Sequence, residues 1–188
     1  MTTILYDGKA LHADKRMVLA TCPSIIRMDG VKLFKSNCEQ MAVGFSGTLP
    51  GESDIQSRFF PMIKLLLEKF GTAKNTDHLF VQTLKETIEP SFSILERECV
   101  VITRETALVL HEWDVNEERG GRPDYVHTVT VQTGMPVGLG TGGRYAIGAY
   151  HVSKDVGKAY GVASTLDYLT GSVFDTIRHT DLKPLVIK

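Results

Sequence analysis

The segment GTGGRYAIGAY, residues 140–150, constrains the fold of this chain more than any other stretch of its sequence. Three glycines within four positions, directly before an alanine- and glycine-rich helical stretch, indicate a turn whose backbone comes very close to another part of the molecule. The only side chain inside this turn is that of Thr141, which carries a hydroxyl group. A phosphate-binding loop is excluded by the context, because Arg144-Tyr145 follow the glycines where such a loop has Lys-Ser or Lys-Thr.

The start of the chain gives this turn a chemical meaning. The sequence begins Met1-Thr2-Thr3-Ile4. If Met1 is removed, Thr2 carries a free α-amine and a β-hydroxyl on one residue, so that the amine can serve as general base for the hydroxyl. Together, Thr2 and the glycine turn suggest an N-terminal-nucleophile hydrolase.

The composition excludes several other classes of protein. The chain has 188 residues, 43% hydrophobic and 23% charged, and a formal net charge of −1, as in an ordinary globular domain. It has no basic stripe or tail, so nucleic acid is not an expected partner. With no signal-peptide pattern and no apolar run of about eighteen residues, a membrane is not expected either. Three widely spaced cysteines, Cys22, Cys38 and Cys99, predict free thiols in a reducing, cytoplasmic compartment.

Short strands are predicted in the first 48 residues, and helices after them. Asp7-Gly8 is a turn signal between two apolar runs and predicts a tight hairpin. In the following helix Ser53 and Gln56 form a capping box, and Pro61 marks a kink or the helix start. The strands are expected over residues 4–6, 10–13, 17–21, 32–34 and 41–45, and two amphipathic helices over 55–70 and 79–88.

The second half repeats this order. Strands are expected over residues 100–103, 107–113, 126–131 and 171–177, helices over 143–152 and 156–168, and a solvated loop over 116–124. Each amphipathic element must cover a sheet face, so the order predicts an α+β fold with helix layers outside two packed sheets. The chain shows no repeat and no linker, so residues 1–188 are expected to form a single domain.

Five segments occur in the order in which proteasome β-subunits and the bacterial peptidase HslV carry them, and the chain resembles a divergent member of that family. The segments are TTILYDGKALHADKR, the lysine of GVKLF, MAVGFSG, GTGGRYAIGAY and ASTLDYLTGS. A Gly-X-Gly-Gly turn alone is a weak signal, but five ordered matches from Thr2 to about Thr176 are specific. The resemblance implies a four-layer αββα sandwich of two antiparallel sheets between helix layers, a homo-oligomeric ring, peptide or unfolded-protein substrates, an ATP-dependent unfoldase as a further partner, and no cofactor.

The resemblance also implies roles for seven residues. Thr2 matches the nucleophile, Lys32 the catalytic lysine, and Asp14 the acid that supports this lysine. Gly47 matches the glycine whose backbone N–H binds the oxyanion, a contribution of about 3 kcal/mol in related chemistry. The remaining three, which complete the hydrogen-bond network around the nucleophile, are Thr141, Asp167 and Thr170.

Two departures from the family pattern bear on this site. Thr141 and Thr170 stand where the family has serine, which keeps each hydroxyl but adds a methyl group and restricts χ1. The N-terminal hairpin is also about three residues shorter by our alignment with the family, which could move Asp14 relative to Lys32.

Each site residue has a plainer interpretation when taken singly. Thr2 is a common small residue after an initiator methionine, Lys32 could be a solvated lysine, and Asp14 could cap a turn. Asp167 could be an exposed helix-end acid, and Thr141 could simply fit its turn. Two functions therefore stand, a threonine peptidase subunit and a catalytically silent structural or assembly ring subunit, with an amidase as a distant third. The six histidines show no paired metal-ligand spacing, so no metal is expected.

Overall fold

The computed structural model describes residues 3–21, 24–46, 51–70, 98–114, 125–131 and 134–186. In this part of the chain all paired strands are antiparallel, which confirms the expected α+β class with antiparallel sheets. None of the helices in these ranges is long and apolar enough to cross a membrane.

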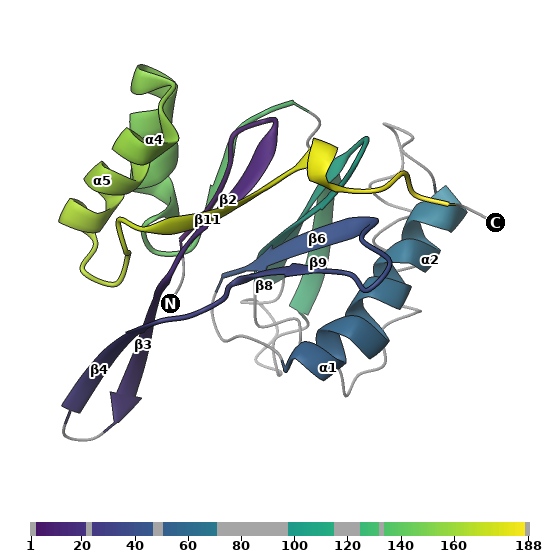
Figure 1. Cartoon of the computed structure of the whole chain (residues 1–188), viewed down its shortest axis with the longest axis horizontal. Coiled ribbons are helices and arrows are strands. Elements are labelled where there is room, and N and C mark those ends of the chain that lie inside the picture. Colours follow the sequence, from purple (N-terminus) through teal and green to yellow (C-terminus); the bar gives the residue numbers. More distant parts are fainter. Residues whose placement is uncertain are drawn as a thin grey trace.

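The strands form two sheets and a separate two-stranded ribbon that projects from the body of the molecule (Figure 1). The four-stranded sheet has the order β10 (Val137–Leu139), β1 (Ile4–Tyr6), β2 (Ala10–Asp14) and β11 (Phe174–Arg178). The five-stranded sheet has the order β5 (Leu33–Lys35), β6 (Met41–Phe45), β7 (Cys99–Thr103), β8 (Ala107–Asp114) and β9 (Tyr125–Val131). The ribbon consists of β3 (Arg16–Thr21) and β4 (Ser24–Asp29).

Helices lie at opposite ends of the molecule, as Figure 1 shows. At one end a short α1 (Glu52–Asp54) runs through a π-helical turn, Ile55–Phe59, into α2 (Phe60–Phe70). At the other end α4 (Gly143–Ser153) packs against α5 (Val156–Leu166). A 3₁₀ turn, His179–Asp181, follows the last strand.

Three clusters of buried side chains hold these elements together. Ile4 and Leu11 of the four-stranded sheet share one cluster with Val100 of the five-stranded sheet, so the two sheets bury residues against each other. The next residue along the chain, Val101, belongs instead to a cluster with Phe59, because successive strand side chains point to opposite faces. The third cluster joins the four-stranded sheet to α5 through Leu5, Ala159 and Tyr160.

Most predicted elements are confirmed, and the Asp7-Gly8 hairpin is clearest. Gly8 has a φ of +93°, the left-handed conformation that favours glycine. The Asp7 carboxylate accepts backbone hydrogen bonds from Lys9 (2.8 Å) and Ala10 (2.7 Å), which closes the turn. Two short strands, β4 and β10, were not predicted. The expected helix over 79–88 and loop over 116–124 lie outside the described residues.

The predicted capping box is wrong. Ser53 lies inside α1, and the N-cap of this helix is Gly51, which has no side chain to accept a hydrogen bond from the first turn. Gln56 bonds across the fold instead: its amide nitrogen donates to the Lys35 carbonyl (2.7 Å) and its oxygen accepts from the Asn37 N–H (3.0 Å). Pro61 lies just after the π-helical turn, inside the continuous helical run from Glu52 to Phe70, so it marks an irregularity within the helix and not the start of the helix.

The close backbone approach predicted for the glycine turn occurs between the turn and strand β10. A Cβ atom added to Gly138, in β10, would lie 2.2 Å from the Gly143 carbonyl oxygen at the start of α4. Nothing lies within 4 Å of a Cβ added to Gly148, also in α4. The first glycine is therefore required by packing, and the second is not.

Gly138→Ala should therefore lower the free energy of unfolding by about 2–3 kcal/mol, since backbone must move to admit the methyl group. Gly148→Ala, the matched control, should raise it by about 0.5–1 kcal/mol, because alanine restricts the unfolded chain and favours the helix. Urea unfolding monitored by circular dichroism gives both values. Equal stability of Gly138→Ala and the parent protein would contradict this packing.

The Asp7 turn makes stability depend on pH. Burial alone would raise the pKa of Asp7, but the His12 ring, with Nε2 3.4 Å from the carboxylate, and the hydrogen bonds from the Lys9 and Ala10 N–H groups outweigh it and lower the pKa from 3.8 to about 2. A carboxyl group with a depressed folded-state pKa stabilises the protein above its unfolded-state pKa, and this contribution disappears as pH falls from about 4 to about 2.

Asp7→Asn keeps the turn acceptor but removes the charge. It should be less stable than the parent protein by about 1–2 kcal/mol at pH 7, and this difference should shrink steadily below pH 4. Urea unfolding at a series of pH values measures the difference. A difference that stays constant down to pH 2.5 would show that the charge contributes nothing.

Candidate active site

A buried ion pair between Asp14 and Lys32 stands at the centre of the site. Asp14 ends β2 in one sheet and is fully buried, and Lys32 directly precedes β5 in the other and is 2% exposed. The Lys32 Nζ lies 3.0 Å from each Asp14 carboxylate oxygen. The shorter N-terminal hairpin therefore does not separate these two residues.

The Lys32 ammonium has a third partner in the carbonyl oxygen of Arg16, which accepts a hydrogen bond from it. Burial lowers the pKa of Lys32, while the charge and hydrogen bonds of Asp14 act in the opposite direction without restoring the usual value. With acceptors on Asp14 and Arg16 for all three of its protons, Lys32 acts on its surroundings mainly as a fixed positive charge.

The Asp14 carboxylate also accepts three backbone N–H groups. These come from Thr3 (2.7 Å), Arg16 (3.1 Å) and Gly171 (3.0 Å). One carboxylate thus joins the start of β1, the start of the ribbon and the loop after α5. Thr2 and Gly47 lie outside the described residues. Thr3 follows Thr2 directly, however, and consecutive Cα atoms are about 3.8 Å apart, so the bond to Asp14 holds the chain next to Thr2.

A chain of hydroxyl groups leads from Thr3 to a second carboxylate. Oδ2 of Asp167 accepts hydrogen bonds from Thr141 (2.6 Å) and Thr170 (2.8 Å). The Thr170 oxygen lies 2.6 Å from the Thr3 hydroxyl. Because the proton of Thr170 is directed to Asp167, Thr3 must be the donor to Thr170. Burial raises the pKa of Asp167, but these hydrogen bonds outweigh it and hold the pKa below its usual value.

Thr141 and Thr170, the two positions at which the family pattern has serine, both donate hydrogen bonds to Asp167. Thr141 is partly exposed, and its single proton points to Asp167. Its oxygen can therefore only accept a hydrogen bond from a group on its open side. Asp167 itself is the C-cap of α5 and is 8% exposed, so it is not a solvated helix-end acid.

Gly142 explains why the turn is rich in glycine at this point. A Cβ atom added there would lie 2.1 Å from the Thr170 hydroxyl oxygen and 2.4 Å from that of Thr3. Both hydroxyls lie in close contact with the backbone of the turn, so any residue larger than glycine at position 142 would displace them.

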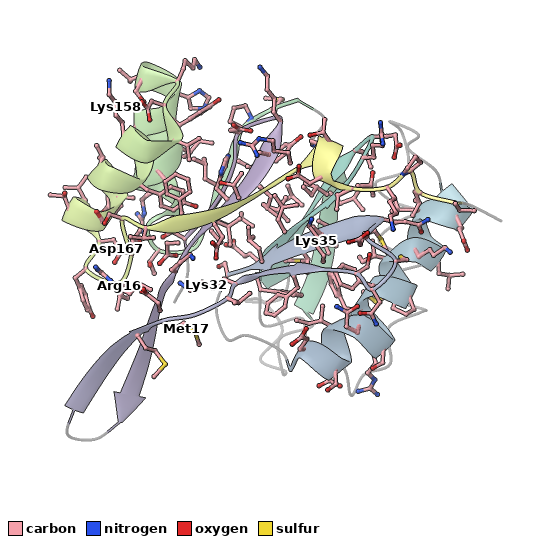
Figure 2. The ribbon with its side chains drawn as sticks, in the orientation of Figure 1. Arg16, Met17, Lys32, Lys35, Lys158 and Asp167 are labelled. Carbon is pink, nitrogen blue, oxygen red and sulfur yellow. The ribbon has the colours of Figure 1, made fainter. Side chains whose placement is uncertain are left out.

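Arg16 is a site residue that the sequence analysis missed. Its guanidinium donates to the carbonyl oxygens of Tyr168 (3.0 Å) and Thr170 (2.7 Å), and its own carbonyl accepts from Lys32. Figure 2 shows Arg16, Lys32 and Asp167 at the base of the projecting ribbon. Arg16 therefore links the ion pair to the Asp167 loop. No pattern in the sequence marks this role, because the partners of the guanidinium are backbone carbonyl groups, which every residue has.

Among the residues that the structure describes, no three His, Cys, Asp or Glu side chains gather in a way that could hold a metal ion.

Comparison with known proteins bears on the fold of this chain. No family model matches the sequence, and no curated protein matches it. The structure is similar to that of eukaryotic HslV from Trypanosoma brucei, with a TM-score of 0.56 and 18% identity over 93% of this chain and 97% of that one. It is also similar to BPH from Thiobacillus denitrificans, with a TM-score of 0.51 and 11% identity over 94% and 95% of the two chains. These likenesses support a proteasome- and HslV-like fold for this chain.

Proposed function

We propose that this chain is a proteasome-like threonine peptidase subunit, in which Thr2 hydrolyses peptide bonds after Met1 is removed. Residues 1–188 would form one N-terminal-nucleophile hydrolase domain, a four-layer αββα sandwich. The observation that carries the proposal is the convergence on Thr3: the Asp14–Lys32 pair binds its N–H side, and the chain from Thr170 to Asp167 binds its hydroxyl.

In this mechanism the Thr2 hydroxyl attacks the substrate carbonyl while the α-amine of Thr2 takes up the hydroxyl proton. The nearby positive charge of Lys32 favours the developing alkoxide and disfavours a charged amine, so that the amine is neutral at about pH 7–8. The Thr141 oxygen accepts a hydrogen bond from the amine or from a water between them, which orients the amine's lone pair.

The tetrahedral intermediate places its oxyanion at the backbone N–H of Gly47. Its collapse transfers the proton from the amine to the departing peptide nitrogen and leaves the acyl group as an ester on Thr2. The amine then takes a proton from a water as that water's oxygen attacks the ester, and it passes the proton to the Thr2 oxygen when the ester bond breaks and the second product leaves. Asp14 takes no proton in this scheme and serves to position Lys32.

The proposal predicts that activity is lost on substitution of Thr2 or Lys32 but not of a lysine outside the site. In Met1-free protein, Thr2→Ala should abolish cleavage of a fluorogenic peptide, and Lys32→Ala should lower kcat/KM at least about 10²-fold, since it removes the charge that tunes the base. Lys35→Ala is the matched control, because Lys35 is exposed, ends β5 and lies apart from Arg16, Lys32 and Asp167 (Figure 2). It should retain full activity.

Labelling with a threonine-directed electrophile, located by peptide mass spectrometry, separates chemistry from substrate binding. The labelling rate should rise with pH to a plateau near pH 8 as the amine loses its proton. Circular dichroism checks that Lys32→Ala, which leaves a buried carboxylate unpaired, still folds; Lys32→Arg provides a charged variant if it does not. Absence of both labelling and cleavage in Met1-free parent protein would favour the second candidate, a catalytically silent ring subunit.

The proposed peptidase should assemble as a homo-oligomeric ring, because a nonspecific site is safe inside a cell only when it is enclosed. Large apolar side chains are exposed around the site and ribbon, including Met28, Val31, Tyr168 and Val173, and these could supply subunit contacts. Sedimentation velocity should show a species of about six or seven 20.8 kDa subunits. A monomer at every concentration would contradict the ring. For the assembled ring, an ATP-dependent unfoldase is the expected further partner.

A further inference from the structure

Two tyrosines tie strand β1 to the helices above it, one at each end of the strand. The Tyr160 hydroxyl, from α5, donates to the Thr3 carbonyl oxygen (3.3 Å). The Tyr150 hydroxyl, from α4, donates to the Asp7 carbonyl oxygen (3.4 Å). The two bonds are chemically alike, but only the Tyr160 bond lies beside Thr2.

Tyr160 is fully buried, and its ring stacks on Phe174 with centroids 4.7 Å apart. Phenylalanine would fill this space equally well, and a buried hydroxyl group is unfavourable unless it forms a hydrogen bond. Burial and the negative charge of Asp14 both raise the pKa of Tyr160, so the hydroxyl keeps its proton and remains a donor. The hydroxyl of Tyr160 is therefore explained by its hydrogen bond to Thr3, since packing alone does not require it.

The bond from Tyr160 completes the fixation of Thr3. The Thr3 N–H donates to Asp14, and its hydroxyl donates to Thr170. Its carbonyl oxygen accepts from both the Asp14 N–H (3.1 Å) and Tyr160. Without Tyr160 the Thr3 carbonyl would keep only the bond from the Asp14 N–H. The peptide plane between Thr3 and Ile4 could then rotate about this one remaining hydrogen bond.

We propose that Tyr160 is a positioning residue for the nucleophile: its hydrogen bond to Thr3 fixes the direction in which the chain leads to Thr2, and so the placement of the Thr2 hydroxyl and amine relative to Lys32. This inference rests on the proposed peptidase function. A displacement of about 1 Å in a catalytic group can lower a rate about 10²-fold, so one hydrogen bond here has a measurable effect on turnover.

The test compares Tyr160→Phe with Tyr150→Phe in Met1-free protein. Each variant loses one phenol-to-carbonyl hydrogen bond to a residue next to β1, Thr3 or Asp7. Tyr160→Phe should lower kcat for a fluorogenic peptide at least about tenfold with KM unchanged, whereas Tyr150→Phe should keep kcat within about twofold of the parent. The pH midpoint of electrophile labelling should also move upward in Tyr160→Phe, because the amine leaves the field of Lys32. A purely structural role would not move that midpoint.

Amide hydrogen exchange at Thr3 provides a readout that does not depend on activity. Tyr160→Phe should lower the protection of the Thr3 amide at least about tenfold, and Tyr150→Phe should leave it unchanged. Unchanged kcat and unchanged Thr3 protection in Tyr160→Phe would overturn the inference, as would an equal loss of kcat in both variants. A parent protein that neither labels nor cleaves would overturn the proposed function and the catalytic role of Tyr160 with it, while hydrogen exchange would still decide whether the tether exists.

Discussion

The rest of the site depends on the buried carboxylate of Asp14. A buried ion pair is a poor source of stability, because the loss of hydration of two charges offsets much of their attraction. Here the pair forms because the carboxylate collects backbone N–H groups from Thr3, Arg16 and Gly171 as well as the Lys32 ammonium. Displacement of any one of these segments would leave the buried carboxylate with one hydrogen bond fewer in the interior, where water cannot replace it. The three segments are therefore held at fixed positions. The ion pair contributes mainly by fixing this geometry, and less by adding to the free energy of unfolding.

The second carboxylate sets the direction of the hydroxyl chain. Since Asp167 carries no proton, Thr141 and Thr170 both point their protons toward it, and Thr3 points toward Thr170. This order does not depend on whether serine or threonine supplies the hydroxyl. A threonine has a more restricted χ1 angle, so the replacement fixes each hydroxyl in one orientation and leaves the hydrogen bonds in place. The departure from the family pattern is therefore compatible with the proposed chemistry.

The sequence predicted those elements whose conformation depends on neighbouring residues, such as turns and continuous apolar strands. The Asp7-Gly8 hairpin follows from turn geometry, and the strand over 41–45 follows from a continuous apolar run. Strand β10 has only three residues, one of which is Gly138, so no apolar run marks it in the sequence and its pairing with β1 is what makes it a strand. The capping box failed for a similar reason: Gln56 found a partner in the β5–β6 turn, far from it in sequence.

The site shows the same division. The resemblance to a known family indicated Asp14, Lys32, Thr141, Asp167 and Thr170, and the structure brings these residues together around Thr3. Arg16 and Tyr160 act through backbone carbonyls more than 150 residues away in the chain. Neither spacing nor residue type marks such contacts, because a carbonyl group is present at every position. Long-range bonds to the backbone are thus the part of a site that sequence reasoning is least able to find.

The convergence on Thr3 also bears on how the site could be activated. The bonds to Asp14, Thr170 and Tyr160 all use atoms of Thr3, so none of them has to break when Met1 is removed. Processing would therefore change the chemistry of one nitrogen, from an amide that cannot accept a proton to an amine that can, while the surrounding charges and hydroxyls stay in place. A catalytic group that becomes active within a structure already arranged for it needs no further reorganisation during reaction, which is the condition under which fixed charges lower a barrier most.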